Sequence, residues 1–368
     1  MSEQAPAEHF GERALQVMHE MLQLDDAYTL AHDDGFSWWP SEVPVRFRWR
    51  APIAVDGLPV WRLSAEVEVV RGVDPTSQQL DAYLLMTSTV LNQFATVVED
   101  GTLKLRALVY ALPEGDASVL VQLIYRAAFM VRVAEQMVPG TLKLLGGGKL
   151  FGIGGPKLIR STHPVAGRRR EAATQLVAFF DAALRLGGTP SPLDRRPDLG
   201  AAMVALGQAG CDKVAGPSVA EGVDDVQGFN VVLETQHATS LFELRLDEAN
   251  PNVGRGLLAV LRVRFPKGHL HGDAHRLARE LNDAEWSATT PLHVQGAWSA
   301  NAAGADVAHS AFYPNVVHHP ALGREIALDG VRRVRWVFDR FGYREPFMRE
   351  GPYANLLLGR PEAAGLEA

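Results

Sequence analysis

Residues 91–137 read LNQFATVVEDGTLKLRALVYALPEGDASVLVQLIYRAAFMVRVAEQM, and they contain the patterns from which we infer the fold class. The Asp100-Gly101 pair is typical of a tight turn, and the alternation after it predicts a strand over Thr102–Ala111. Apolar residues then recur at helical spacing, which predicts a long helix over Asp116–Met137. A strand followed by an amphipathic helix indicates a sheet with helices packed on it, which is the α+β class.

A hairpin is predicted upstream of this stretch. Apolar and polar residues alternate over Val45–Arg50 and again over Val60–Val70, with Asp56-Gly57 between them as the turn. If the hairpin forms, three arginines lie across from two glutamates on its polar face, an arrangement that favours a single register. These residues are Arg46, Arg48 and Arg50 on one strand, and Glu66 and Glu68 on the other. Helices are predicted on either side of the hairpin, over Glu12–Leu24 and Thr76–Asn92.

The second half of the chain repeats this order of elements. We predict a helix over Leu199–Gln208, strands over Phe229–Thr235, Leu241–Leu246 and Leu257–Phe265, a helix from Asp273 to Asn282, strands over Leu292–Ala300 and Val307–Tyr313, and a helix over Leu328–Phe341. Local detail recurs as well: Leu281-Asn282 matches Leu91-Asn92, and the alternation of Leu292, Val294 and Trp298 matches that of Leu103, Leu105 and Val109. We therefore expect two repeated units of mainly antiparallel sheet packed with helices.

A run of Gly, Pro, Ser and Thr over residues 187–192 predicts the junction between the units. The expected organisation is a first domain at 1–187 with a basic, glycine-rich arm at 140–170, a linker at 188–197, a second domain at 198–343 and a tail at 344–368.

Length, charge and cysteine content exclude several classes of protein. At 368 residues, the chain has room for two domains of ordinary size. Its net charge of -7 argues against a general nucleic-acid binder. The single cysteine, Cys211, excludes a disulfide framework and a cysteine-built zinc site, and it favours a cytoplasmic location. We expect no signal peptide and no membrane span, because the longest apolar stretch, Ala117–Met137, contains too many polar groups.

Residues 91–137 resemble the second half of a YbjN-type domain, and the element order of each half resembles the type III secretion chaperone-like fold. Such domains place a helix ending in an asparagine before a strand, an acidic-glycine turn, a second strand and a long amphipathic helix. Asn92, Asp100-Gly101 and the helix from Asp116 match this arrangement, whereas the second half has Thr289-Thr290-Pro291 in place of the turn. The resemblance implies a non-enzymatic, cytoplasmic protein that holds another polypeptide, with a tandem that mimics the homodimer of single-domain chaperones.

A metal-dependent hydrolase is the alternative function. Its candidate ligands are His269, His271 and His275, which resemble the zinc run of metallo-β-lactamase-like hydrolases. The third histidine comes one residue late for that run, and Asp273 within it is also explained as a helix N-cap. A second group, His309, His318 and His319, has no spacing that would bring three nitrogens together.

The arm at 140–170 is the most unusual segment. Its Lys and Arg residues from Lys143 to Arg170 are accompanied by no acidic residue, so the remainder of the chain is more acidic than the total charge suggests. It fits neither the phosphate-loop nor the dinucleotide pattern. One interpretation is a solvated insertion, and the other is an arm that contacts a polypeptide partner or this chain's own acidic surface. Nucleic-acid or anionic-partner binding through the arm is a further alternative function.

We predict partner binding but no catalytic residue, metal or cofactor, because no nucleophile elbow and no Cys-His context are found. The candidate partner-binding residues are Trp38, Trp39, Arg46, Arg48, Arg50, Lys149, Phe151, Lys157, Arg168, Arg169 and Arg170. Three other interpretations stay open: core packing of the tryptophans, pairing of the first three arginines with Glu66 and Glu68, and a solvated helix end for the last three. We expect a polypeptide-binding protein that uses apolar grooves or an open strand edge, as a monomeric pseudo-dimer or a homo-oligomer.

Overall fold

A computed structural model shows how the chain folds. It describes residues 28–55, 58–74, 91–111, 118–137, 157–159, 193–208, 214–219, 226–234, 239–264, 274–287, 295–300 and 306–340, together with positions 16, 20, 80, 83, 84, 87 and 293. Among these residues, no helix is long and apolar enough to cross a membrane.

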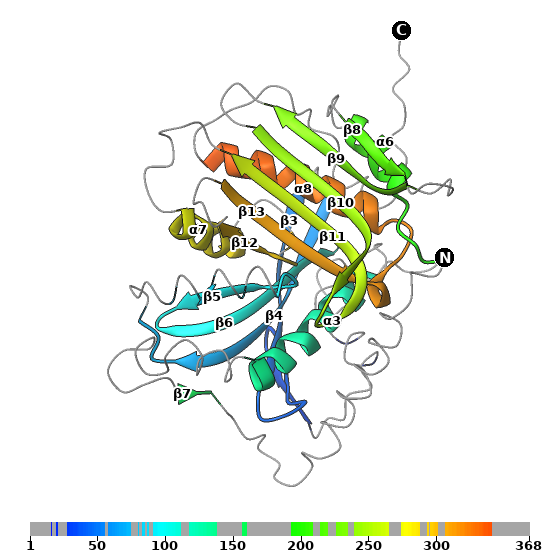
Figure 1. Ribbon diagram of the computed structural model, residues 1–368. Coiled ribbons are helices and arrows are strands. Elements are labelled where there is room, and N and C mark those ends of the chain that lie inside the picture. The colour runs from blue at the N-terminus through cyan, green and yellow to red at the C-terminus, as the bar shows by residue number, and fades with distance from the viewer. Residues whose placement is uncertain are drawn as a thin grey trace.

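The first sheet has seven strands among the described residues (Figure 1). They are β1 (Thr29–His32), β2 (Gly35–Trp38), β3 (Val45–Val55), β4 (Leu58–Arg71), β5 (Ala95–Glu99), β6 (Thr102–Ala111) and β7 (Lys157–Leu158). The order across the sheet is β1-β2-β3-β4-β6-β5, with β7 paired to β4, and neighbouring strands are antiparallel. Helix α3 (Ser118–Arg132) packs on β4 and β6 and continues as the π-helical turn η3 (Val133–Met137).

The second sheet, in its described part, has six antiparallel strands in the order β12-β13-β11-β10-β9-β8. The strands are β8 (Val214–Val219), β9 (Val226–Glu234), β10 (Thr239–Asn250), β11 (Gly254–Arg264), β12 (Ala297–Ala300) and β13 (Asp306–Pro314). The accompanying helices are α6 (Leu199–Gln208), α7 (Ala274–Ser287), the short 3-10 helix η5 (Asn315–Val317) and α8 (Leu322–Arg340). Helix α8 packs against α6, β10 and β11, and so runs along one face of this sheet (Figure 1).

Both sheets have the same strand order. Counted along the chain, each runs 1-2-3-4-6-5, if the short β7 is left aside. Helical residues also separate the fourth strand from the fifth in both: α7 in the second unit, and Leu80, Tyr83, Leu84 and Thr87 in the first. A long helix follows the sixth strand in each, α3 in one and α8 in the other. The prediction of an α+β protein with two antiparallel sheets is confirmed, and the shared order supports a duplicated unit.

Two details of the predicted repeat are wrong. Four strands precede the middle helix in each described sheet, whereas the sequence predicted two in the first unit and three in the second. The missed strands β1, β2 and β8 are too short or too irregular to show a clear alternation. The strand that holds Val109 is the sixth of its sheet, whereas Trp298 lies in β12, the fifth strand of the other. The counterpart of β6 is therefore β13, and the predicted match between these two residues does not hold.

Helix bounds depend on packing as well as on sequence. Helix α6 has the predicted bounds, but α8 begins at Leu322 rather than Leu328, and α7 continues to Ser287 rather than ending at Asn282. Gly323 and Gly330 lie inside α8, where they pack closely against Leu199 and Phe242. These close contacts explain why two residues of low helix propensity lie within a helix.

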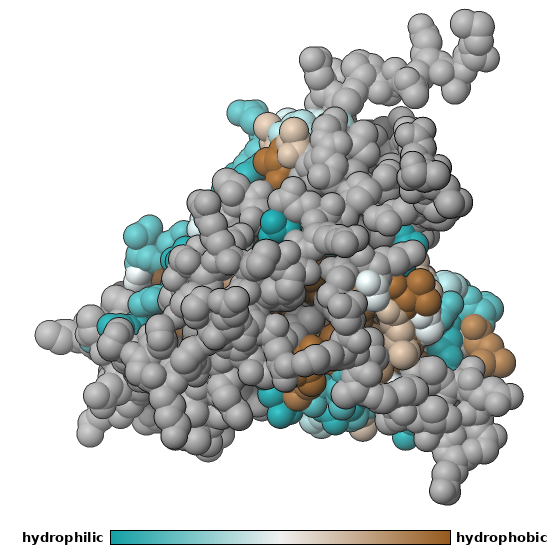
Figure 2. Space-filling model, turned by 90° about the horizontal axis from the view of Figure 1, so that it is seen from above, coloured by the Kyte–Doolittle hydropathy of each residue, from teal (hydrophilic) through white to brown (hydrophobic). Residues whose placement is uncertain are grey.

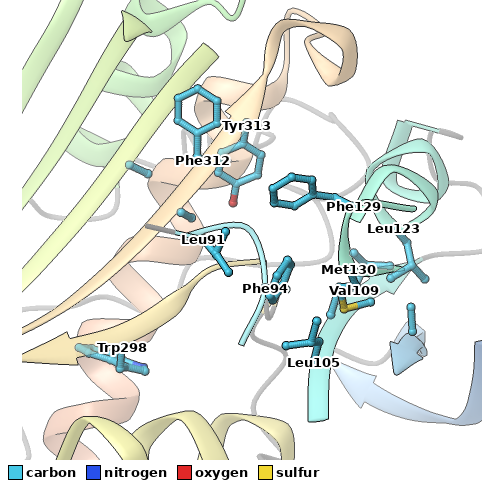
Figure 3. Packing of buried hydrophobic residues seen from close by; sticks show 14 of the residues in the cluster. Leu91, Phe94, Leu105, Val109, Leu123, Phe129, Met130, Trp298, Phe312 and Tyr313 are labelled. Carbon is cyan, nitrogen blue, oxygen red and sulfur yellow. The ribbon is translucent and has the colours of Figure 1, made fainter. Parts of the chain in front are cut away.

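The apolar core is continuous between the two sheets. Phe312 and Tyr313 of β13 lie next to Leu91, Phe94 and Phe129 of the first unit (Figure 3). The amide of Phe312 donates a hydrogen bond of 2.7 Å to the backbone carbonyl of Asn92. Strands β5 and β12, which form one edge of each sheet, lie close to one another in this central region. The predicted domain boundaries stay predictions; of the linker only residues 193–197 are described, and the tail lies outside the described residues.

Candidate functional site

Strand β4 offers an edge that its neighbour β3 does not cover. Pairing between the two strands ends where Glu66 lies opposite Arg46, yet β4 continues to Arg71. A strand edge of this kind exposes main-chain N–H and C=O groups that are able to pair with another segment.

A segment of the basic arm occupies this edge. Strand β7 pairs antiparallel with the end of β4: Leu158 lies opposite Val70, and Lys157 lies opposite Arg71. The amide of Ile159 donates a hydrogen bond of 2.9 Å to the carbonyl of Val69. The arm thus adds a two-residue strand beyond the end of β3, a position that no hairpin of the first sheet fills in the described structure. We call this position the strand slot.

The other described sheet edges differ in accessibility. All four residues of β12 and the first three of β5 are buried, so these edges are closed to a partner. Strand β1 pairs with β2, and Leu30 in β1 is 44% exposed. Among the described residues only Leu30, Leu193 and Val204 are exposed large apolar side chains, and the described apolar residues appear as separate brown patches (Figure 2). Strand edges are therefore better suited to a polypeptide than apolar grooves in this part of the chain.

Two of the three hairpin arginines are held by an aspartate that the sequence pattern did not indicate. Arg46 and Arg48 lie 3.1 Å and 3.5 Å from the carboxylate oxygens of Asp34, in the turn between β1 and β2. The backbone register places Arg46 opposite Glu66 as predicted, but the Glu66 carboxylate binds cations of β6 instead. The prediction that these arginines pair with Glu66 and Glu68 is wrong, because strand register sets which residues are adjacent but not where long side chains reach.

Cations of β6 complete the ion pairs on this polar face of the first sheet. Arg106 Nε lies 2.6 Å from Glu66 Oε2, and Arg106 Nη2 lies 2.6 Å from Glu99 Oε2. Lys104 Nζ lies 2.7 Å from the same Glu99 oxygen. The hydrogen bond from Lys104 and the nearby charge of Arg106 lower the pKa of Glu99, although burial opposes this shift. These groups satisfy one another and leave little free charge.

Arg50 and Arg62 form a different arrangement on the same face. They lie directly opposite one another on β3 and β4, and Tyr110 of β6 lies opposite Arg62 on its other side. The Arg62 guanidinium lies 5.0 Å from the ring centroid of Trp286 and donates to the Trp286 carbonyl. Burial lowers the pKa of Arg62, and the charges of Arg50 and Arg106 lower it further. No carboxylate of the described chain pairs with Arg50 or Arg62.

The predicted aromatic anchor lies inside the protein. Trp38 and Trp39 are 3% and 9% exposed, and the amide of Trp39 donates 2.9 Å to the carbonyl of Tyr28. Core packing accounts for both rings, so they do not form a docking surface. Of the arm residues, the structure describes the backbone of Lys157, whereas Lys149, Phe151, Arg168, Arg169 and Arg170 lie outside the described residues.

The predicted metal run is described only in part. His275 lies in the first turn of α7, while His269, His271, Asp273 and Cys211 lie outside the described residues. In the described ranges, no group of three or more His, Cys, Asp or Glu side chains could hold a metal ion.

The second histidine group serves packing. His309 lies against Trp298, with 5.4 Å between ring centroids, and burial lowers its pKa well below the ordinary value. His318 Nε2 donates to the Tyr313 carbonyl at 2.8 Å, and burial lowers its pKa to about 4. His319 is directed away from both, toward Glu325 at 3.5 Å.

The long helix after the sixth strand of each sheet, α3 in the first and α8 in the second, carries one fully buried arginine. The sequence patterns did not identify either arginine. Arg126 of α3 is 1% exposed and donates 2.6 Å to the carbonyl of Gln93, with longer bonds to Gln295 and to the Phe312 carbonyl. Its guanidinium lies 4.9 Å from the ring of Tyr313. Burial lowers the pKa of Arg126 to about 10. The sequence signal that could have indicated a buried arginine is the position of Arg126 within the apolar run of a predicted helix.

Arg333 of α8 has carboxylate partners instead. Its Nε donates to Glu285 at 2.6 Å, it also binds Asp329, and its Nη2 donates to the carbonyl of His293 at 2.7 Å. Trp298 Nε1 donates to Glu285 at 2.8 Å. This network is closed to solvent, so it serves to hold α7 and α8 together rather than to bind a ligand.

No protein-family model, no curated protein and no solved structure matches this chain.

Proposed function

We propose that the protein binds extended segments of other polypeptides by strand addition at the strand slot. One observation carries the proposal: the end of β4 already accepts a strand, Lys157–Leu158, from a distant part of the chain. In strand addition, main-chain hydrogen bonds supply affinity and alternate side chains supply specificity. The pairing of β7 with β4 has this form.

The shortness of β7 supports exchange with a partner. Two paired residues and the bond from Ile159 give few main-chain contacts, and short isolated strand pairings are marginal in water. The tether to the rest of the chain raises the local concentration of this segment and so keeps it in place. A partner segment that pairs with the end of β4 in the strand slot competes directly with β7.

We also propose a fold for the two units and a cellular location for the protein. We infer that both units share the type III secretion chaperone-like fold and form a pseudo-dimer, on the basis of their common strand order. The single cysteine supports a cytoplasmic location.

The test displaces β7 from the strand slot and then adds the segment that contains β7 as a separate peptide. Ile159→Pro removes the N–H that bonds the Val69 carbonyl, so β7 should leave β4. Faster amide hydrogen exchange at residues 69–71 reports this step. A fluorescein-labelled peptide of residues 154–162, GGPKLIRST, should then bind the variant about tenfold or more tightly than the wild type, whose own arm competes.

The same peptide with proline at the Ile159 position is the matched control and should not bind. Arg71→Gln is the control on the protein, because the Arg71 side chain is 66% exposed and the slot uses its main chain. Equal affinity of the peptide for wild type and variant, or no protection of residues 69–71 when it binds, contradicts the proposal.

A further inference from the structure

Arg50 and Arg62 are two positive charges that lie opposite one another on the neighbouring strands β3 and β4. Opposite residues of an antiparallel pair have Cβ atoms about 5 Å apart, and like charges at such positions destabilise the sheet. The other described cations on this face have carboxylate partners: Arg46 and Arg48 bind Asp34, Arg71 binds Glu68, and Lys104 and Arg106 bind Glu66 and Glu99. Arg50 and Arg62 are the exception among the described cations of this face.

Arg62 is held in place by contacts that leave its charge unneutralised. It is 8% exposed, stacks on Trp286 and donates to the carbonyl of that residue. Its Nε is buried and has no hydrogen-bond acceptor among the described residues. A buried donor without an acceptor is costly, and in native proteins such groups are often completed by a ligand or a water molecule.

Arg50 brings the pair to the surface. Its side chain is exposed, and the pairing of β3 with β4 shifts register directly after it, between Arg50 and Ile53. Pro52 lies within this irregularity, where its missing N–H removes no ladder hydrogen bond. Bulges of this kind redirect side chains and are frequent beside binding sites. The pair therefore joins the exposed side chain of Arg50 to the buried guanidinium of Arg62.

We propose that Arg50 and Arg62 form a binding site for a side-chain carboxylate of an acidic peptide, with Trp286 and Tyr110 beside it. Arginine binds carboxylates through two parallel, charge-assisted hydrogen bonds, and one bound anion neutralises both guanidiniums in part. This site does not depend on the strand slot, because Arg62 and Arg71 are about 30 Å apart along an extended strand.

A carboxylate suits the surroundings better than a phosphate. Arg106, the next cation on this face, already binds Glu66 and Glu99, and Asp283 lies one turn before Trp286 on α7. The chain as a whole carries a net charge of -7. A doubly charged phosphate meets more repulsion from these groups than a singly charged carboxylate does.

The test measures the anisotropy of fluorescein-labelled hexaglutamate with the full-length protein at low ionic strength. Arg50→Gln should weaken binding about tenfold or more, since it removes a charge-assisted hydrogen bond. Arg262→Gln removes the same charge from an exposed arginine of β11, outside both proposed sites, and should leave binding unchanged. Arg50→Glu should abolish binding and also raise the thermal midpoint by about 1–2 °C, because it places opposite charges on β3 and β4.

Three results would overturn the assignment. Equal losses in Arg50→Gln and Arg262→Gln would mean that binding is only general attraction to positive charge. A lower midpoint in Arg50→Glu would mean that Arg50 has a stabilising partner within the chain. Displacement of hexaglutamate by inorganic phosphate at lower concentrations than by free glutamate would identify a phosphate site instead.

Discussion

Replacement of Arg333 by methionine should strongly destabilise the second unit. The change keeps most of the side-chain volume but removes the only cation, among the described residues, of a network in which Glu285 and Asp329 are both buried. Removing one partner of a buried ion pair costs about 3–5 kcal/mol, because the remaining charge is left in a medium of low polarity. The hydrogen bond from Trp298 to Glu285 stays and offsets part of the loss. We expect the free energy of unfolding at pH 7 to fall by about 3–4 kcal/mol.

The loss should become smaller as the pH falls. In the wild type, burial acts to raise the pKa of Asp329, but Arg333 outweighs it and holds this pKa below its ordinary value. Burial raises the pKa of Glu285 even with Arg333 present. Without the arginine, both folded-state pKa values lie above the unfolded values of about 4, so the folded variant takes up protons. Its stability therefore rises relative to the wild type between pH 7 and about pH 5.

Urea unfolding followed by circular dichroism at these two pH values measures both effects. Arg126→Met is the matched control, because it also removes a buried arginine but leaves carbonyl and amide oxygens rather than carboxylates. Its cost should not change with pH in this range. Glu285→Gln added to Arg333→Met should recover part of the stability at pH 7. A cost below about 1 kcal/mol at pH 7, or one that is equal at both pH values, would refute this reasoning.

Gly330→Ala should destabilise the protein by about 1–3 kcal/mol despite the better helix propensity of alanine, because the new Cβ would lie 2.5 Å from the Phe242 ring. Adding Phe242→Leu to this variant should recover stability in urea unfolding. If it does not, the steric explanation is contradicted. Gly101→Ala should cost about 1 kcal/mol, since Gly101 has a φ of 68°. Gly207→Ala in α6 should instead stabilise by up to about 1 kcal/mol, because no atom of the described residues lies within 4 Å of the added Cβ. Thermal midpoints that move in the same direction in the two variants would count against this. Burial lowers the pKa of His293 to about 4, below the unfolded value of about 6.5, so stability should be lost as pH falls from 6.5 toward 4, and His293→Gln should flatten this dependence in urea titrations. An unchanged slope would assign the acid sensitivity to other groups.

Features that depend on neighbouring residues were predictable from the sequence. Asp100 and Gly101 have φ angles of 50° and 68°, as a two-residue hairpin turn of this type requires, and the strands on either side pair as expected. The pairing of Arg46 opposite Glu66 follows from the alternation of the two strands. The turn position alone would place Arg46 opposite Val67, and the register shift between Arg50 and Ile53 accounts for the difference of one residue. The number of strands was underestimated, since β1 and β2 have four residues each and alternation over so few positions is a weak signal.

The candidate sites were predictable only in part. Arg50 and Lys157 were among the predicted partner-binding residues, but the end of β4, Arg62 and Trp286 were not. Residues 62 and 286 are 224 positions apart, and no periodicity relates them. In the same way, the predicted anchor at Trp38 is buried as part of the apolar core that residues from both sheets form.

By itself, the sequence determined the local conformations: where the chain turns, which residues alternate, which helices are amphipathic, and that the same elements occur twice. Only the tertiary structure decided which charged groups are satisfied and which are left over, and which strand edges are closed and which accept a segment from elsewhere. The physical reason is that strand and helix patterns arise from neighbours along the chain. The environment of Arg126, Arg333 or Arg62 is instead set by how elements from distant parts of the chain pack around it.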